Sequence, residues 1–149
     1  MINPYPGIGP IDHIGIAVVD LEAALRFYHH TLGLAAPVIE EVPDQMVRTA
    51  IFGSGDGRIE LLESTDPDGP IAKFIAKRGE GIHHVALRVT DVKSKLMELE
   101  AQGVTLIDRT PRIGAGGHHI AFVHPKATGG VLLELCQHCE PDPQEPSRH

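Results

Sequence analysis

Four residues whose side chains can bind a metal ion recur in two parts of the chain at nearly equal spacing. His13 and His84 are 71 positions apart, and Glu60 and Glu134 are 74 positions apart. Each stands within a short apolar segment, and the segments are Ile11–Val18, Ile59–Leu61, Ile82–Val89 and Leu133–Leu135. Two imidazoles and two carboxylates suit a divalent ion such as Co, Mn, Ni or Zn, whereas calcium and magnesium prefer oxygen ligands alone. The repeat therefore predicts one divalent metal ion held by both halves of the chain.

The alternation of side chains along these segments predicts that the four residues share one concave surface. Successive side chains of a strand point to opposite faces, so His13 shares a face with Gly15, while Ile14 and Ile16 point the other way. A carboxylate between apolar neighbours in a buried strand is costly unless a proton or a cation neutralises it. The alternative is that the histidines are core residues and the glutamates face solvent. Recurrence of all four residues in register favours a shared cation over that alternative.

The elements that position these residues follow from the same repeat. Each half reads as a strand, a helix that begins after Asp20 or Asp91, and two or three further strands. The expected ranges are about 11–19, 21–32, 36–42, 46–53 and 58–63 in the first half, and about 82–90, 91–102, 104–108, 118–123 and 131–136 in the second. Between the halves, Pro70 opens a short helix over about 70–78.

The length and composition are those of one globular domain. The chain has 149 residues, of which 42% are apolar and 22% are charged, within the usual range for such a domain. We expect an N-terminal arm over residues 1–10 and one domain over 11–138, with modules at about 11–63 and 82–138. The segment 139–149 is polar and rich in proline, which predicts a disordered tail.

Charge and hydropathy exclude several classes of partner. The net charge is −7 and only 4% of the residues are aromatic, which argues against a nucleic-acid partner. No apolar run approaches the roughly 20 residues that a membrane-spanning helix needs, so we expect no membrane partner. The N-terminus lacks the pattern of a secretory signal, and there are two cysteines, which favours a cytoplasmic location.

Over about residues 11–138 the sequence resembles the vicinal oxygen chelate superfamily, and within it the methylmalonyl-CoA epimerases. The motifs that carry the resemblance are Ile11–Ala17, Ile59–Glu63, Gly79–Ala86, Ile113–Gly117 and Phe122–Leu135. The resemblance implies an α+β fold in which two tandem βαβββ modules form a curved, mixed, eight-stranded sheet around a metal-binding cleft. The metal ligands of the family fall on the four residues chosen above, which are His13, Glu60, His84 and Glu134. A homodimer is also implied.

The resemblance further implies metal-dependent epimerisation at C2 of methylmalonyl-CoA. The C2 proton would be removed and returned through an enolate that the metal stabilises, and Glu134 is the candidate catalytic base. An anionic acyl-CoA thioester needs local positive charge, for which we expect Arg112 or Lys126. The backbone N–H groups of Gly116 and Gly117 would assist. The alternative is that these four residues only close a turn between strands.

The chain departs from part of that family at one position. Some members place a second glutamate, as a partner base, on the strand before Glu60, where this chain has Thr49. Threonine is no general base near neutral pH. Other members carry glutamine in place of Glu60, which implies that Glu60→Gln has little effect. Two other functions stay open, a glyoxalase I-type lactoylglutathione lyase with the same ligands and a non-enzymatic drug-binding module of the same fold.

Overall fold

The chain repeats the order strand, helix, three strands, with one helix between the repeats. The computed structural model describes residues 7–139, so residues 1–6 of the expected arm and 140–149 of the expected tail lie outside the described residues. The first repeat comprises β1 (Ile8–Ala17), α1 (Leu21–Leu25), β2 (Val38–Val42), β3 (Val47–Phe52) and β4 (Arg58–Ser64). Helix α2 (Pro70–Arg78) follows. The second repeat comprises β5 (Gly81–Val89), α3 (Val92–Ala101), β6 (Arg112–Ile113), β7 (His119–Val123) and β8 (Leu133–Gln137).

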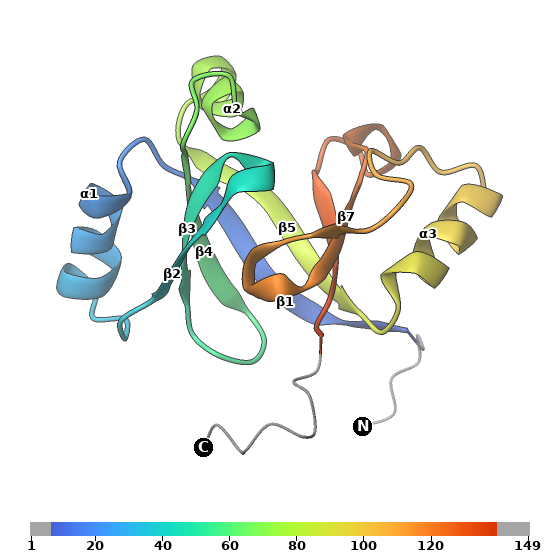
Figure 1. The fold of residues 1–149 in the computed structure, drawn as a ribbon, viewed down its shortest axis with the longest axis horizontal. Coiled ribbons are helices and arrows are strands. Elements are labelled where there is room, and N and C mark those ends of the chain that lie inside the picture. The colour runs from blue at the N-terminus through green and yellow to red at the C-terminus, as the bar shows by residue number, and fades with distance from the viewer. Residues whose placement is uncertain (1–6, 140–149) are drawn as a thin grey trace.

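All eight of these strands join in one sheet that curls into a half-barrel (Figure 1). The order across the sheet is β2-β3-β4-β1-β5-β8-β7-β6. The first strands of the two repeats, β1 and β5, pair antiparallel at the centre, whereas β1 with β4 and β5 with β8 are parallel. The predicted curved, mixed, eight-stranded sheet is therefore confirmed.

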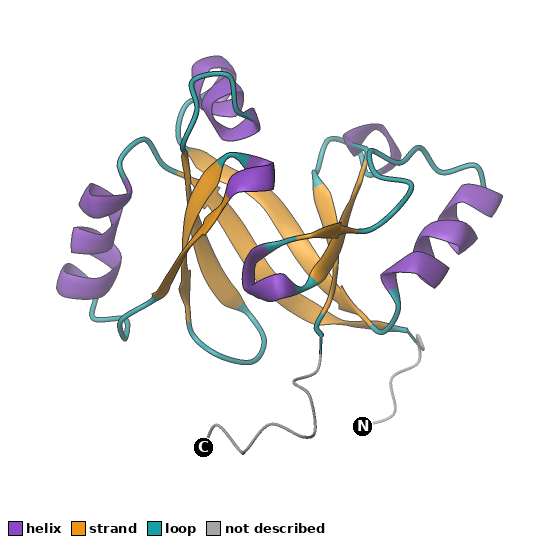
Figure 2. Ribbon diagram, in the orientation of Figure 1, coloured by secondary structure: helices purple, strands orange, loops and turns teal. Residues whose placement is uncertain are grey.

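Helices cover the outside of the curl and leave its inner face to other side chains. Helix α1 packs on the first repeat through buried Leu21 and Leu25, and α3 packs on the second through Val92 and Leu96. Figure 2 shows these helices flanking the sheet on either side, with α2 at one end. The bulky apolar face of each central strand thus faces a helix. None of the helices within residues 7–139 is long and apolar enough to cross a membrane.

Two elements of the first repeat differ from the prediction. Strand β1 begins at Ile8, which pairs with Val89 at the end of β5. Residues 8–10 therefore belong to the sheet and were wrongly assigned to the arm. After Leu25 the helix continues as a wider π-helical turn over Arg26–Thr31, so the predicted helix over 21–32 is present but is not α-helical throughout.

The predicted strand over 104–108 is wrong. That segment makes one isolated bridge, between Leu106 and Val123, and the edge strand is β6, several residues later. The side chain of Asp108 accepts a hydrogen bond from the backbone N–H of Phe122 at 2.8 Å. This side-chain contact adds to three backbone hydrogen bonds between residues 105–108 and 122–124, which do not form a regular ladder.

Candidate metal centre and active site

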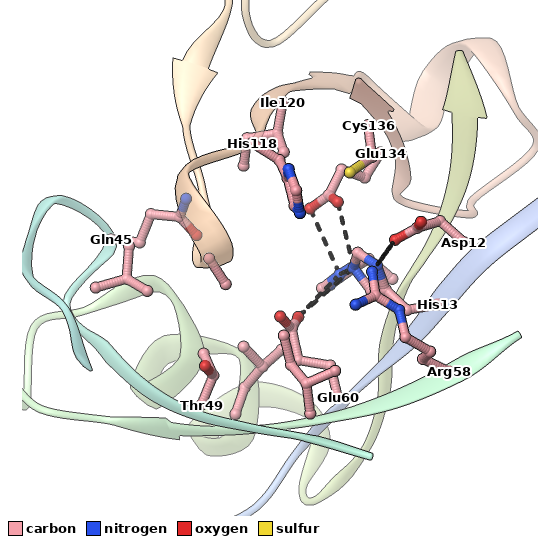
Figure 3. A pocket seen from close by; sticks show the side chains of 15 residues that line it. Asp12, His13, Gln45, Thr49, Arg58, Glu60, His118, Ile120, Glu134 and Cys136 are labelled. Carbon is pink, nitrogen blue, oxygen red and sulfur yellow. Dashed lines mark hydrogen bonds and ion pairs between the residues drawn. The ribbon is translucent and has the colours of Figure 1, made fainter. Parts of the chain in front are cut away.

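The four predicted ligands converge on the inner face of the sheet (Figure 3). They come from β1, β4, β5 and β8, and each is at most 6% exposed. The Nε2 atoms of His13 and His84 lie 3.1 Å apart, and Oε1 of Glu60 lies 3.6 Å from each of them. The Glu134 carboxylate lies 3.2 Å from Nε2 of His13 and 3.5 Å from Nε2 of His84. The sequence prediction that these residues share one surface therefore agrees with the geometry.

Strand register explains how four bulky side chains fit together. Two rows of residues run across the sheet. In each row, an imidazole and a carboxylate flank a small residue of the strand between them. The rows are His84–Gly15–Glu60 and His13–Ala86–Glu134. A Cβ atom placed on Gly15 would lie 2.2 Å from Cε1 of His84. The ring of His84 therefore occupies the space that a side chain at position 15 would need.

The donor set fits a divalent cation. Ligand atoms bound at about 2.0–2.2 Å to one ion lie about 3–4 Å from one another, and the observed separations are 3.1–3.6 Å. Ligand atoms of His13, His84 and Glu134 all lie within 4.8 Å of one another, whereas Glu60 lies outside this tighter group. The carboxylate of Asp12 accepts a hydrogen bond from Nδ1 of His13 at 2.6 Å, which leaves Nε2 of that ring to face a cation.

Burial and crowding perturb three of these groups. Burial alone would lower the pKa of His13, but the hydrogen bond to Asp12 and the nearby Glu134 raise it to about 10. Burial lowers the pKa of His84 to about 4. Burial also raises the pKa of Glu60 to about 7, with Glu134 adding to the increase. Several titratable groups with strongly shifted pKa values in one cavity are typical of a functional site.

A charged network behind His13 was missed from the sequence. Asp12 is fully buried, and its carboxylate contacts Arg58 of β4, Arg88 of β5 and His138, which follows β8. The signal was available in part, because strand alternation places Arg58 on the face of Glu60 and Arg88 on the face of His84. Asp12 gave no such signal, since alternation places it on the face opposite to His13.

Thr49 lies where the sequence comparison placed it. It is 1% exposed and lines the cavity that also holds the four ligands, together with Gln45, Arg58 and His118 (Figure 3). Its hydroxyl lies 3.4 Å from the carbonyl oxygen of Glu40. Position 49 is therefore occupied by a hydroxyl group, which cannot act as a base near neutral pH.

Two further cavities reach His84 from outside. One has a volume of about 350 Å³ and is lined by buried His84 at one end and by exposed Lys77 and Arg78 of α2. The other has a volume of about 390 Å³ and is lined by His84, Phe122 and Arg112, among others. These two cavities could admit a long substrate as far as His84, one of the four metal-binding residues.

The residues predicted to contact CoA do not lie together. Gly116 donates its N–H to the carboxylate of Glu40 at 2.9 Å. Gly117 lies in a small cavity that is also lined by Glu40, Glu41 and Asp44. An anionic phosphate at this loop would meet negative charge.

Arg112 and Lys126 are the two predicted cations. Arg112 lines the cavity of about 390 Å³ and forms an ion pair with Asp108 at 3.1 Å. Lys126 stands in the turn after β7, where its backbone N–H donates to Nδ1 of His124 at 2.9 Å. The role of Arg112, Lys126, Gly116 and Gly117 in binding CoA stays a prediction.

Comparison with known proteins adds to this geometry. Residues 12–122 match the model of the Glyoxalase/Bleomycin resistance protein/Dioxygenase superfamily. An uncharacterized protein of Bacillus subtilis is 45% identical over 127 residues, which are 85% of this chain and 91% of that protein. The ethylmalonyl-CoA/methylmalonyl-CoA epimerase of Cereibacter sphaeroides is 37% identical over 132 residues, covering 87% of this chain and 98% of that protein.

A solved structure agrees in both sequence and shape. The crystal structure of methylmalonyl-CoA epimerase from Mycobacterium tuberculosis has a TM-score of 0.87 and 38% identity, and the match covers 94% of each chain. Together with the paired modules and the four convergent ligands, these matches show that the chain belongs to the glyoxalase/bleomycin resistance protein/dioxygenase superfamily and, within it, to the methylmalonyl-CoA epimerase family.

Proposed function

We propose that this chain is a metal-dependent epimerase that acts at C2 of methylmalonyl-CoA. The observation that most supports this is the placement of two carboxylates, Glu134 and Glu60, on opposite sides of the imidazole pair (Figure 3). Inversion of a carbon centre needs a proton taken from one face and a proton delivered to the other. Family membership supports an isomerase, since relatives are named as epimerases of methylmalonyl-CoA.

The chemistry explains why a cation belongs in the site. The carbon C2 of methylmalonyl-CoA carries the proton that must be removed. This carbon lies between a thioester and a carboxylate that is already negative. A divalent ion held by His13, Glu60, His84 and Glu134 would supply positive charge that stabilises the enolate formed when this proton leaves. Co, Mn, Ni and Zn are the ions that best suit two imidazoles and two carboxylates.

Proton transfer is assigned to the chain's own carboxylates. Glu134 accepts or returns the proton on one face of C2, and Glu60 does so on the other. Thr49 cannot serve this purpose. Glu60→Gln is therefore expected to impair this chain, although glutamine is tolerated in some relatives.

The substrate's position follows from the cavities. The cavity that contains Thr49 and the four metal-binding residues has a volume of only about 30 Å³. The acyl group would therefore lie against His84 in the cavity of about 390 Å³, and the long thioester tail would leave through the cavity beside α2. Exposed Lys77 and Arg78 line that outer cavity and can meet the phosphates of CoA. In this arrangement, Lys77 and Arg78 supply the positive charge that the sequence analysis assigned to Arg112 or Lys126.

The first experiment is an epimerase assay on protein treated with a chelator and then supplied with single divalent ions. We expect inversion of methylmalonyl-CoA and deuterium uptake at C2 in heavy water, both dependent on the ion. Turnover of a glutathione hemithioacetal instead would indicate a lactoylglutathione lyase. Tight drug binding without cation uptake would indicate a binding module. Absence of C2 exchange in active, metal-loaded protein would exclude the enolate route.

A second experiment tests the tail route. Charge reversal of Lys77 and Arg78 together is expected to raise KM for methylmalonyl-CoA about 10-fold, a modest effect because both cations are exposed. KM for methylmalonyl-pantetheine, which lacks the nucleotide, is expected to stay unchanged. Lys126→Glu is the matched control. A larger effect of Lys126→Glu on the CoA ester alone would return the phosphate site to the predicted loop.

We also propose that the protein is a homodimer and is located in the cytoplasm. The first proposal rests on the family resemblance, and size-exclusion chromatography with light scattering tests it. The second rests on Cys136 and Cys139, which form no disulfide within residues 7–139, as is usual for proteins of a reducing compartment, and cell fractionation tests it.

A further inference from the structure

The residue before each ligating histidine lies at a break in the pairing of β1 with β5. The register shifts between Ile11 and His13 on β1, and between Gly15 and Ile16 opposite β5. These shifts leave Asp12 without a partner on β5 and His83 without a partner on β1. Such β-bulges turn a side chain away from the face that alternation assigns to it. The two bulges are 71 positions apart in sequence, like the histidines, and each places a side chain behind one imidazole.

At the first bulge the carboxylate of Asp12 uses both of its oxygens. Oδ2 accepts hydrogen bonds from Nδ1 of His13 at 2.6 Å and from Arg58 at 2.8 Å. Oδ1 accepts from Arg88 at 2.8 Å and lies 2.5 Å from Nε2 of His138. Because this group is fully buried, rotating it away would leave the guanidinium group of Arg58 without its ion-pair partner, which is unfavourable.

This contact determines the role of each ring nitrogen of His13. An ionised carboxylate only accepts hydrogen bonds, so Nδ1 of His13 carries a hydrogen and Nε2 is the nitrogen that can release its proton to a cation. That Nε2 lies 3.1 Å from Nε2 of His84 and 3.2 Å from Glu134, at the centre of the four ligands. A hydrogen bond to the second nitrogen is the usual way in which a ligating histidine is oriented.

At the second bulge the ring of His83 lies behind His84, in the place that Asp12 occupies behind His13. Nδ1 of His83 lies 3.0 Å from Nδ1 of His84, and either ring can donate to the other. The ring of His83 packs edge-on against Phe74, with centroids 5.0 Å apart. Within residues 7–139 no ion pair of His83 with a carboxylate is present, so nothing comparable to the Asp12 network holds His84.

We propose that Asp12 is a positioning residue that keeps a hydrogen on Nδ1 of His13 and so aims Nε2 of that ring at the cation site before the cation arrives. This inference rests on the metal centre of the proposed function. It assigns no corresponding role to His83, although His83 occupies the equivalent bulge. Asp12 acts through His13 and does not itself touch a cation or substrate.

The tautomer is measured directly by nitrogen-15 NMR of the imidazole rings in metal-free wild-type protein. We expect a hydrogen on Nδ1 of His13, bonded to a carboxylate, and, because the pKa of this ring is raised to about 10, a hydrogen on Nε2 as well near neutral pH. A form of His13 with hydrogen on Nε2 alone would overturn the proposal, and this measurement needs no variant.

Two variants at the two bulges then provide a matched comparison. Asp12→Asn is expected to mix the tautomers of His13 and to weaken Co²⁺ binding, measured by equilibrium dialysis, by about 10- to 100-fold. His83→Asn is expected to weaken it by about 3-fold at most, and circular dichroism checks that both variants are folded. The proposal would be overturned if Asp12→Asn left the His13 tautomer unchanged and kept the Co²⁺ affinity within about twofold of that of the wild type. If Asp12→Asn does not fold, the wild-type tautomer decides.

Failure of this inference is distinct from failure of the proposed function. Wild-type protein that binds Co²⁺ but does not epimerise methylmalonyl-CoA would remove the proposed activity and leave the role of Asp12 intact. Active, metal-loaded protein in which His13 carries hydrogen on Nε2 alone when metal-free would do the reverse.

Discussion

The two repeats provide equivalent ligands but surround them with different chemistry. His13 lies beside Ala86 and is backed by a carboxylate, whereas His84 lies beside Gly15 and is backed by an imidazole. Their ring planes are 88° apart. The hydrogen bond to Asp12 overcomes burial and raises the pKa of His13 to about 10, while burial lowers the pKa of His84 to about 4. Duplication of the backbone thus preserved the positions of the ligands, and the neighbouring side chains made the two imidazoles unequal.

The carboxylates occupy equivalent rows of the sheet. Burial, with Glu134 nearby, raises the pKa of Glu60 to about 7. In the first repeat Thr49 of β3 also lines the cavity that contains both glutamates.

Removing a ligand of the second repeat is expected to have the largest effect. Glu134→Gln, and separately His84→Ala, should lower kcat for methylmalonyl-CoA epimerisation at least about 1,000-fold, because a base or a ligand is lost. Circular dichroism should show an intact fold. Activity near that of wild type in either variant would contradict the assigned centre.

The small residues beside the two imidazoles give the next largest contrast. Gly15→Ala would place a Cβ atom 2.2 Å from the ring of His84, so the ring must move and Co²⁺ affinity should fall about 10- to 100-fold. Ala86→Gly, the matched change beside His13, removes a methyl group without displacing a ligand and should change affinity less than about 3-fold. Equal effects in the two variants would contradict the structural difference between the repeats.

Glu60→Gln sharpens the comparison between the two carboxylates. We expect kcat to fall about 10- to 100-fold, as for loss of one general acid or base. Because Glu134 remains, one epimer of methylmalonyl-CoA should still exchange its C2 hydrogen with heavy water, without inversion. The measurement is deuterium uptake into each purified epimer. Inversion at the wild-type rate would show that Glu60 does not transfer a proton.

The smallest expected effect concerns stability in metal-free protein. The pKa of Glu60 is about 7 in the folded chain, above its ordinary value, so the unfolded chain ionises first as the pH rises. The free energy of unfolding of the wild type should therefore fall by roughly 1–3 kcal/mol between about pH 4.5 and pH 7. This fall should be absent in the Glu60→Gln variant. Urea denaturation of both proteins at several pH values measures it. A pH-independent difference between them would contradict the assigned burial cost.

Much of the centre could be predicted before the structure because its signals are local. A strand alternates its side chains with a period of two residues, and the repeat presented the same pattern twice. Those two facts were enough to choose His13, Glu60, His84 and Glu134 and to place them on one face. The helices that begin after Asp20 and Asp91 also follow from local signals, since each aspartate accepts a hydrogen bond from the backbone of the first turn.

The predicted glycine loop shows where local signals were insufficient. Its sequence contains backbone donors suited to an anion, but the N–H of Gly116 is already bound to Glu40, which is 76 positions away in the chain. No window around Gly116 contains that carboxylate. The segment over 104–108 also depends on distant residues, because it meets β7 through one isolated bridge, irregular backbone hydrogen bonds and the side chain of Asp108.

By itself, the amino-acid sequence determined which four side chains form the centre, because duplication and strand periodicity are visible among neighbouring residues. Only the tertiary structure decided what stands behind each imidazole. The bulges at Asp12 and His83 exist because β1 and β5 pair with a register that slips by one residue. Such a slip depends on two distant strands meeting, and it reverses the face to which alternation assigns a side chain.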